Sequence, residues 1–451
     1  METQKPRAPL FTNRALVNLA VPITLNSLMA IFMGMADSVM VSSAGAAAVS
    51  AVSLVDAINN VFTTAFDAIP IGGSIVTSQY IGARQYEKAK ESVRQILYSG
   101  VVIAVLCMVV LLCLRGQVLN LIYGTIEQDV FDNAMVYFTI TLLSFPFMVV
   151  GCTSTATLRA MAKNRQAVTI TISVNLLNVV GNAVLIYGFH LGVAGAALST
   201  AFARLVWCVW GVLALRSRKL PIRLEKVFPV RVRWDAMKRV LRVGVTNGFE
   251  NALFYIGRLA VSSLVASLGT IYIAAYSLAS SLNNFGWTMV AAFTTTSMTV
   301  VGQCIGAGEK EQAKQNAKKL LTAGTVMMLV CFSLVAIFSP QLVRLYKLTP
   351  EELEVAARYT RFAALLTIAT GYSMSFVPMG VFRAAGDIRY PMVVTTSTMF
   401  VLRVGLSYVL CDGLGMGLDG VWLGMAADWL CRTILNSIHF KQGKWLHKKL
   451  I

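Results

Sequence analysis

Long apolar runs recur along the whole chain, and they constrain its fold more than any other feature. A helix that crosses a bilayer needs roughly 20 mostly apolar residues. Twelve runs in the 451-residue sequence meet this requirement, so we predict twelve membrane-spanning helices. They fall near 15–42, 49–78, 96–115, 134–157, 167–189, 193–215, 241–267, 271–301, 320–339, 360–381, 392–411 and 416–438.

The composition agrees with a membrane protein and excludes two other classes. Charged residues make up only 13% of the chain and the mean hydropathy is +0.67, whereas an average soluble domain carries roughly 25% charged residues. A soluble enzyme and a disordered chain are therefore excluded. No nucleophile–base set, metal motif or phosphate-binding loop is present, so we expect neither enzymatic activity nor a cofactor.

The basic residues are distributed unequally between the two sides of the predicted spans. Thirty of the 39 Lys and Arg residues lie in the termini and in every second connection. Because basic connections stay on the cytoplasmic side, both termini are predicted to be cytoplasmic. This pattern requires an even number of spans, which supports the count of twelve.

A net charge of +18 raises the question of an acidic partner. The basic residues separate apolar runs and do not cluster on a polar domain, so we expect no nucleic acid partner. The longest cytoplasmic connection carries ten of them, from Arg216 to Arg242. They suit anionic lipid headgroups at the cytoplasmic face, and simple topological signalling explains them equally well.

The sequence contains an internal repeat at an offset of 224 residues. Residues 79–90 read QYIGARQYEKAK, and residues 303–314 read QCIGAGEKEQAK. Asn59–Asn60 and Asn283–Asn284 share this offset, as do Arg159–Ala160 and Arg383–Ala384. Such separated anchors indicate a duplication of six spans.

The duplication predicts an all-α integral membrane protein with two six-helix lobes, related by a parallel pseudo-two-fold repeat. We expect an N-lobe over 1–215, a basic cytoplasmic linker over 216–240, and a C-lobe with a cytoplasmic tail over 241–451. Substrate sites in transporters of this kind lie between two halves that rock against each other. Asn59, Asn283 and Asn284 are our candidates for a substrate cleft.

Asp37 is the most informative of the few ionisable residues inside the predicted spans. An acid at the bilayer centre costs roughly 2.5–3.5 kcal/mol, and no arginine follows Arg14 in the same span. Pro22 lies 15 residues earlier and should bend this helix. A buried carboxylate of this kind can hold a proton, or a sodium ion if neutral oxygens surround it.

Suitable neutral oxygens occur in two later spans. Asn178 and Asn182 are four residues apart and share one helix face, and Thr200 follows in the next span. We therefore predict a cation-coupling site made of these three residues and Asp37, with bound Na⁺ as one possibility.

Other buried charges leave alternatives open. Glu250, in GVTNGFENALF, is a second-lobe candidate for binding a proton, a cation or a cationic substrate. Asp428 and Arg432 are four residues apart, which indicates an ion pair within one helix. Asp56 lies near a span start and is interpreted as interfacial, whereas Asp67 has no partner that the sequence identifies.

Several motifs, taken in order, resemble those of the bacterial multidrug and toxic compound extrusion (MATE) transporters. They are Pro22 with Asp37 in MGMADSVMVSSAG, the two IGA segments, Asn178 in NLLNVVGNAVLIYG, LGVAGAALST, and MGLDGVWLGMAADW. VSLVDAINN and VTNGFENALF look like the members from Gram-positive bacteria. The resemblance covers nearly the whole chain.

The resemblance implies an antiporter of the bacterial cytoplasmic membrane. Such proteins expel organic, cationic amphiphilic compounds in exchange for H⁺ or Na⁺ by rocker-switch alternating access, and we expect a monomer. The cation site that it implies maps onto Asp37, Asn178, Asn182 and Thr200. Relatives often carry a second acid where this chain has Asn182, so one negative charge fewer favours H⁺ over Na⁺.

Two alternatives to drug efflux remain. The first is a flippase of the same superfamily that moves a lipid-linked precursor, although those relatives often have about fourteen spans. The second is a non-transporting receptor or channel, against which the duplication and the lack of a sensing module argue.

Overall fold

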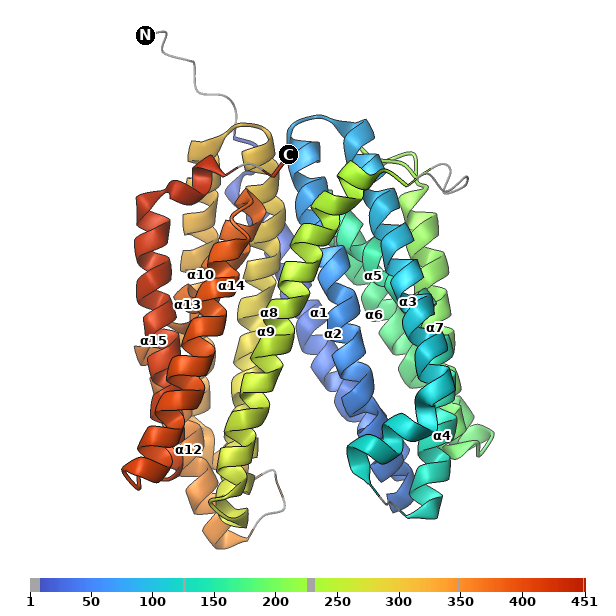
Figure 1. The fold of residues 1–451 in the computed structure, drawn as a ribbon, viewed down its shortest axis with the longest axis vertical. Helices are drawn as coiled ribbons and strands as arrows, with labels where there is room; N and C mark the ends of the chain where they lie inside the picture. Colours follow the sequence, from blue (N-terminus) through green and yellow to red (C-terminus); the bar gives the residue numbers. More distant parts are fainter. Residues whose placement is uncertain (1–8, 125–126, 225–231, 345, 347–348, 449) are drawn as a thin grey trace. The chain divides into compact units, whose positions relative to one another are not determined.

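A computed structural model describes residues 9–124, 127–224, 232–344, 346, 349–448 and 450–451 (Figure 1). Within these residues the chain is helical almost throughout and contains no β-strand. It divides into two compact units, Val21–Gly248 and Met1–Ala20 with Phe249–Ile451, which we call the N-unit and the C-unit. The division falls inside two helices, next to Pro22 in the first of them.

The helices of the N-unit begin with the larger part of α1, which continues without interruption through Pro22. The unit ends with the first part of α8, up to Gly248. Its elements are α1 (Asn13–Ser42), α2 (Ala46–Gly82), α3 (Tyr86–Tyr123), α4 (Gln128–Leu143), α5 (Phe145–Ala160), α6 (Asn164–Asn182), the π-helical turn η1 (Ala183–Gly188) and α7 (Gly192–Leu215).

The C-unit contains the remaining helices, of which α14 continues into two π-helical turns and α15 is followed by a short 3-10 turn. The elements are α8 (Trp234–Ala266), α9 (Thr270–Gly306), α10 (Lys310–Ile337), α11 (Ser339–Val343), α12 (Pro350–Ala369), α13 (Tyr372–Ala385), α14 (Arg389–Thr398), the π-helical turns η2 (Met399–Leu406) and η3 (Val409–Gly413), α15 (Leu418–Gln442) and η4 (Lys444–His447).

Each of the twelve predicted spans coincides with a helix or with consecutive helices. Among the described residues, eight helices are long and apolar enough to cross a membrane, and two bent helix pairs bring the number up to ten. The two remaining predicted spans are α8 and α15, which carry charged residues such as Glu250 and Asp428 in their middle parts. The chain is therefore an all-helical, multi-pass membrane protein.

The spans predicted at 134–157 and 360–381 are each broken into two helices. α4 and α5 meet at 48°, where Pro146 in the first turn of α5 has no backbone N–H to continue the preceding helix. α12 and α13 meet at 53°, where Gly371 adopts a left-handed φ of 65°. Local residue chemistry thus sets both breaks.

The repeat that the sequence predicts recurs in the backbone of the two units. Helices α2 and α9 both end in the same turn. In it the N–H of Ala83 or Ala307 donates to the carbonyl four residues earlier, at 2.9 Å in both copies, and the N–H of the next residue donates to the carbonyl three residues earlier, at 3.0 Å in both copies. The next residue has a positive φ in both copies, 58° at Arg84 and 78° at Gly308. Equal turns at equal offsets confirm the duplication.

One side-chain contact is also repeated. The Nδ2 of Asn59 donates to the hydroxyl of Thr141 at 3.2 Å in the N-unit. In the C-unit, Nδ2 of Asn283 donates to the hydroxyl of Thr367 at 3.4 Å. Each unit therefore uses the same bond to attach its long second helix to the first member of a bent helix pair.

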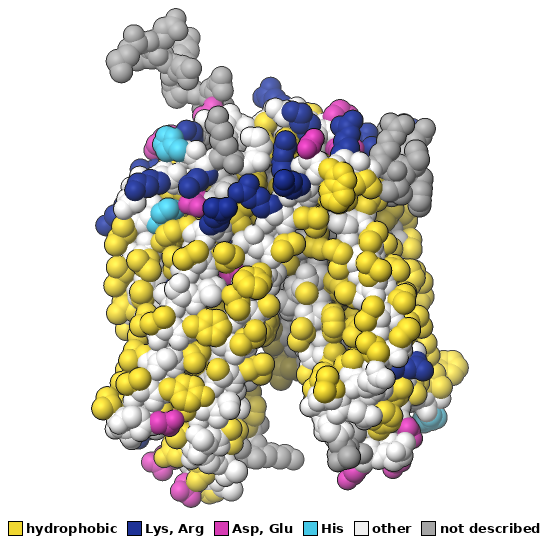
Figure 2. All heavy atoms as spheres, in the orientation of Figure 1, with side chains coloured by type: hydrophobic (Ala, Val, Ile, Leu, Met, Phe, Trp, Pro, Cys, Tyr) yellow, Lys and Arg dark blue, Asp and Glu magenta, His cyan; other side chains and the backbone are white. Residues whose placement is uncertain are grey.

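In the C-unit, three segments that are distant in sequence meet at one end. The N–H of Leu10 donates to Gln312 at 2.8 Å, and Lys319 donates to Asn13 at 2.9 Å. Lys310 contacts His447 at 3.1 Å. On the visible face of this unit, Lys and Arg gather at the end near the C-terminus, and hydrophobic side chains cover the length of the helices (Figure 2).

The predicted division of the chain at 216–240 stays a prediction. The middle of this connection, residues 225–231, lies outside the described residues. On either side of it, Leu224 bonds back to Leu215 at 3.1 Å, and Arg239 donates to the hydroxyl of Tyr80 at the end of α2.

Candidate functional site

Asp37 and Asn182 lie side by side in the N-unit. Asp37 is half-buried on α1, and Asn182, the last residue of α6, is only 2% exposed. The Nδ2 of Asn182 donates to Oδ1 of Asp37 at 2.9 Å. The structure therefore brings together two residues of the predicted coupling site that are 145 positions apart in the chain.

Asn178 and Thr200 complete this group. In the orientation that gives both amide atoms of Asn178 a partner, Nδ2 donates to Oδ2 of Asp37 at 3.2 Å. Its Oδ1 then accepts from the hydroxyl and the backbone N–H of Thr200, both at 3.2 Å. All four predicted residues thus form one connected group, in which amide nitrogens hold both oxygens of the carboxylate.

The local structure of α6 and α7 explains this arrangement. Asn178 and Asn182 are one helical turn apart and face the same way, and the hydroxyl of Ser199 on α7 bonds the carbonyl of Asn178 at 2.8 Å. The α-helix gives way to the π-helical turn η1 directly after Asn182. Such π-helical turns occur frequently at functional sites.

Asn182 also carries an unused acceptor. Its Oδ1 is buried and has no hydrogen-bond partner among the described residues. Buried polar atoms without a partner are rare and require an explanation. Among the described residues no group of three or more His, Cys, Asp or Glu could hold a metal ion, so a bound cation would depend on neutral oxygens and a single carboxylate.

A second polar group in the N-unit involves Asp56, which the sequence suggested to be interfacial. The carboxylate is half-buried, and the hydroxyl of Tyr137 on α4 donates to it at 3.2 Å. Asn59, one turn further along α2, also bonds it. The charge of Asp56 lies close enough to Asp37 for the two carboxylates to repel each other.

Arg204 on α7 is the basic member of this second group. Its Nη1 donates to the hydroxyl of Ser144 at 2.8 Å and to the carbonyl of Thr141 at 3.3 Å. Its charge attracts Asp56. The sequence offered one signal for this group, the spacing of Asp56 and Asn59 on one helix face, but nothing to connect them with α4 and α7.

The remaining predicted residues have different surroundings. Pro22 is half-buried within α1. Asn59 and Asn283 are 4% and 9% exposed and are used in the repeated bonds to threonine, whereas Asn284 is exposed. Their assignment to a substrate cleft stays a prediction.

Two arginines at equivalent positions of the repeat each meet an acid. In the C-unit, Nη2 of Arg383 on α13 contacts Oε1 of Glu250 on α8 at 2.6 Å, and both side chains are nearly buried. In the N-unit, Arg159 attracts Asp67, which also accepts a hydrogen bond from the Cys152 thiol. Glu250 therefore lies in an ion pair, and Asp67 does have partners.

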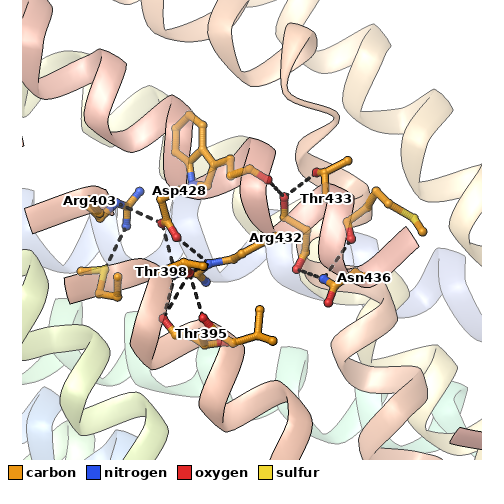
Figure 3. Close-up of polar contacts among 12 residues, drawn as sticks. Thr395, Thr398, Arg403, Asp428, Arg432, Thr433 and Asn436 are labelled. Carbon is orange, nitrogen blue, oxygen red and sulfur yellow. Dashed lines mark hydrogen bonds and ion pairs between the residues drawn. The ribbon is translucent and has the colours of Figure 1, made fainter. Parts of the chain in front are cut away.

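The predicted ion pair on α15 is confirmed, and it is part of a larger group (Figure 3). Nε and Nη2 of Arg432 contact the two oxygens of Asp428 at 2.7 and 3.1 Å. Nε of Arg403, from the π-helical turn η2, approaches the same carboxylate at 3.5 Å. Two buried guanidinium groups thus share one buried carboxylate, so this group has a surplus positive charge.

Aromatic rings and polar groups of three helices surround this surplus charge. Arg403 lies over the rings of Phe254 and Trp429, 5.5 and 5.4 Å from their centroids. Arg432 also donates to the hydroxyl of Thr398 at 2.9 Å and to the carbonyl of Thr395 at 3.3 Å (Figure 3). Because each guanidinium has several partners in the surrounding helices, the group has the character of a structural network.

Comparison with known proteins gives consistent results over the length of the chain. The uncharacterized transporter YisQ of Bacillus subtilis is 25% identical over 451 residues, which cover 99% of this chain and 97% of YisQ. The probable multidrug resistance protein NorM of Thermotoga maritima is 24% identical over 443 residues, covering 96% of this chain and 93% of NorM. A solved MOP superfamily transporter from Pyrococcus furiosus matches the fold with a TM-score of 0.89, at 19% identity and 97% coverage of each chain.

A family model supplies the assignment. The MatE model matches twice, at residues 22–184 and at residues 248–409, in keeping with the duplication. The two matched segments together take in well over half of the chain. The chain therefore belongs to the MatE family, that of the multidrug and toxic compound extrusion transporters.

Proposed function

We propose that this chain is a secondary active antiporter that exports organic cations in exchange for H⁺ or Na⁺, and that Asp37 carries the coupling ion. The observation that supports this role is the Asp37–Asn182 contact of 2.9 Å. A carboxylate whose hydrogen-bond partners are neutral amides and not basic side chains is free to exchange one cation for another.

H⁺ is the coupling ion that we favour. The amide nitrogens of Asn178 and Asn182 face the carboxylate as donors, and donors stabilise its ionised form. A proton on Asp37 would displace one donor and offer its own O–H to the unused Oδ1 of Asn182 after rotation of that amide. The charge-assisted hydrogen bond between α1 and α6 would thereby become a weaker neutral one, which would loosen α1 from α6 and permit bending near Pro22.

Na⁺ is the alternative coupling ion at the same place. Hard cations prefer oxygen ligands, and the group contains a carboxylate, two amide oxygens and the hydroxyl of Thr200. Binding would require both amides to turn their oxygens inward. With one negative charge, the group is less suited to retain Na⁺ than a site with two acids.

The names of relatives and the chemistry of Asp37 support the proposed substrate class. NorM of T. maritima is described as a probable multidrug resistance protein, and the names of the relatives do not favour a lipid-linked precursor flippase. An organic cation would take the place of the coupling cation beside the Asp37 carboxylate, as alternating access requires. The rocker-switch exchange of such a substrate is part of the proposal.

We place the protein in the bacterial cytoplasmic membrane as a monomer with both termini in the cytoplasm. The basic residues of the connections between spans support this orientation. They would also meet anionic headgroups on the cytoplasmic face.

Uptake of a fluorescent organic cation into proteoliposomes tests the function. H⁺ and Na⁺ gradients are imposed separately, and liposomes without protein measure the leak. We expect the H⁺ gradient to drive uptake above that leak. Failure of both gradients, with protein that remains folded, would contradict an antiporter of organic cations.

A further inference from the structure

A cavity of about 700 Å³ opens in the C-unit between α11 and the first part of α12. This volume lies within the range of roughly 300–1,000 Å³ that is typical of ligand pockets. Its lining includes Arg344, Arg358 and Arg361 as well as the apolar residues Leu353, Phe362 and Leu365. The cavity is separate from the groups described above.

The cavity lies at the end of the C-unit that is opposite the termini. Arg358, in its lining, pairs with Asp419, the second residue of α15, at 3.4 Å. The other end of α15 leads into η4 and the C-terminus, where His447 contacts Lys310. Few Lys and Arg residues are expected at this end of a membrane protein, yet three arginines converge on one cavity.

The charge of the lining favours an anion. Arg344 and Arg361 have no ion pair among the described residues, and both are exposed. Arg358 shares its charge with Asp419 but remains 70% exposed. Glu354 is the acid in the lining, and its single negative charge reduces the excess positive charge of the arginines without removing it. An occupant would therefore meet at least one unneutralised guanidinium, which suits a phosphate group.

The lining changes from charged to apolar along α12. Arg358, Arg361 and Leu365 are spaced by three and four residues, so they form one stripe on the helix. Leu365 lies about 6 Å further along the helix than Arg361 and is 51% exposed. Thr349 and Glu352 fix the start of α12 with a capping box, which positions the stripe. An occupant with a charged head and an apolar chain fits this order.

We propose that this cavity binds an anionic phospholipid from the leaflet opposite the termini. The headgroup phosphate lies between Arg344 and Arg361, and an acyl chain follows Phe362 and Leu365 into the apolar part of the bilayer. A zwitterionic headgroup binds less well because its ammonium group meets the same arginines.

Thermal unfolding of the full-length protein in neutral detergent tests the site, with native mass spectrometry as a second readout. Phosphatidylglycerol is compared with phosphatidylcholine of the same acyl chains, and glycerol phosphate serves as the headgroup without chains. We expect phosphatidylglycerol alone to raise the unfolding midpoint. Equal effects of the two lipids, or a full effect of glycerol phosphate, would overturn the proposal.

Variants assign the effect to the cavity. Arg344→Gln with Arg361→Gln should weaken phosphatidylglycerol binding by about fivefold per arginine and so about 25-fold in all. Lys314→Gln with Lys318→Gln removes the same charge from exposed positions of α10, where headgroups would meet separate surface charges and no cavity, and should weaken binding far less than the arginine pair does. Leu365→Ser should weaken the binding of phosphatidylglycerol, which has acyl chains, and should not change the binding of glycerol phosphate, which has none. An equal loss in the α10 control, or an unchanged Arg344/Arg361 variant, would also overturn the proposal.

Discussion

The carboxylate of Asp37 accepts a hydrogen bond from Nδ2 of Asn182 at 2.9 Å, across two helices that are far apart in the sequence. With the Asn178 amide on its other oxygen, both hydrogen-bond partners of the acid are neutral amides. These neutral partners distinguish Asp37 from Glu250 and Asp428, which contact arginines. Our account of ion coupling rests on that difference.

Asn182→Asp should increase the sodium dependence of transport. A second carboxylate beside Asp37 adds the charge that a hard cation requires, and we expect half-maximal activation at an Na⁺ concentration lower by about tenfold. Transport under imposed Na⁺ gradients measures this value. Asn182→Leu removes the amide without adding charge and should not lower the Na⁺ concentration of half-maximal activation. A lower concentration in both variants would contradict direct coordination of Na⁺ by the new carboxylate.

Glu250 and Arg383 should behave as an energetically coupled pair. Either Glu250→Gln or Arg383→Gln leaves a nearly buried charge without its partner, which should cost about 3–5 kcal/mol of unfolding free energy. The double variant should lose less than the sum of both. Unfolding in detergent measures this cycle. If Glu250→Gln remained fully stable and lost its response to the ion gradient, Glu250 would be a coupling acid instead.

The two arginines at Asp428 should contribute unequally to stability. Arg432 makes the two short contacts to the carboxylate, so Arg432→Met should cost about 3–5 kcal/mol. Arg403 adds a second buried positive charge at 3.5 Å, so Arg403→Met should change stability by about 1 kcal/mol or less. The midpoints of unfolding compare the two variants, and the reverse order would contradict the described network.

Placing glycine in the turn after α2, as in the equivalent turn of the other repeat, should increase the stability of the protein. Arg84 has a φ of 58°, a conformation that costs a non-glycine residue roughly 1–2 kcal/mol, and Gly308 occupies this position in the other copy. Arg84→Gly should therefore stabilise the protein by about 1 kcal/mol or less, after the extra chain entropy of glycine. Gly308→Arg should destabilise it, and equal midpoints for both variants would exclude strain.

Local spacing made part of this structure predictable. The twelve helical regions follow from apolar runs, and the pairs Asn178–Asn182 and Asp428–Arg432 follow from the helical period. The breaks at Pro146 and Gly371 also have local causes, although the predicted spans passed through both. The repeat could be recognised because its anchors keep a constant offset.

Contacts between distant helices could not be predicted in the same way. Tyr137 reaches Asp56 across 81 residues, and Arg383 reaches Glu250 across 133. Arg403 reaches Asp428 from the π-helical turn η2, and no residue pattern in the sequence predicted this turn. Helix packing decides these pairs, so the sequence left Glu250 with several interpretations and identified no partner for Asp56.

Proton-driven transport by Asp37→Asn tests the central claim most directly. Reconstituted wild-type protein, Asp37→Asn and the control Asp132→Asn, an exposed acid on α4, are given the same pH gradient and the same fluorescent organic cation. The account predicts that Asp37→Asn falls to the leak of empty liposomes while it still folds, and that Asp132→Asn equals the wild type. Full gradient-driven transport by Asp37→Asn would contradict it.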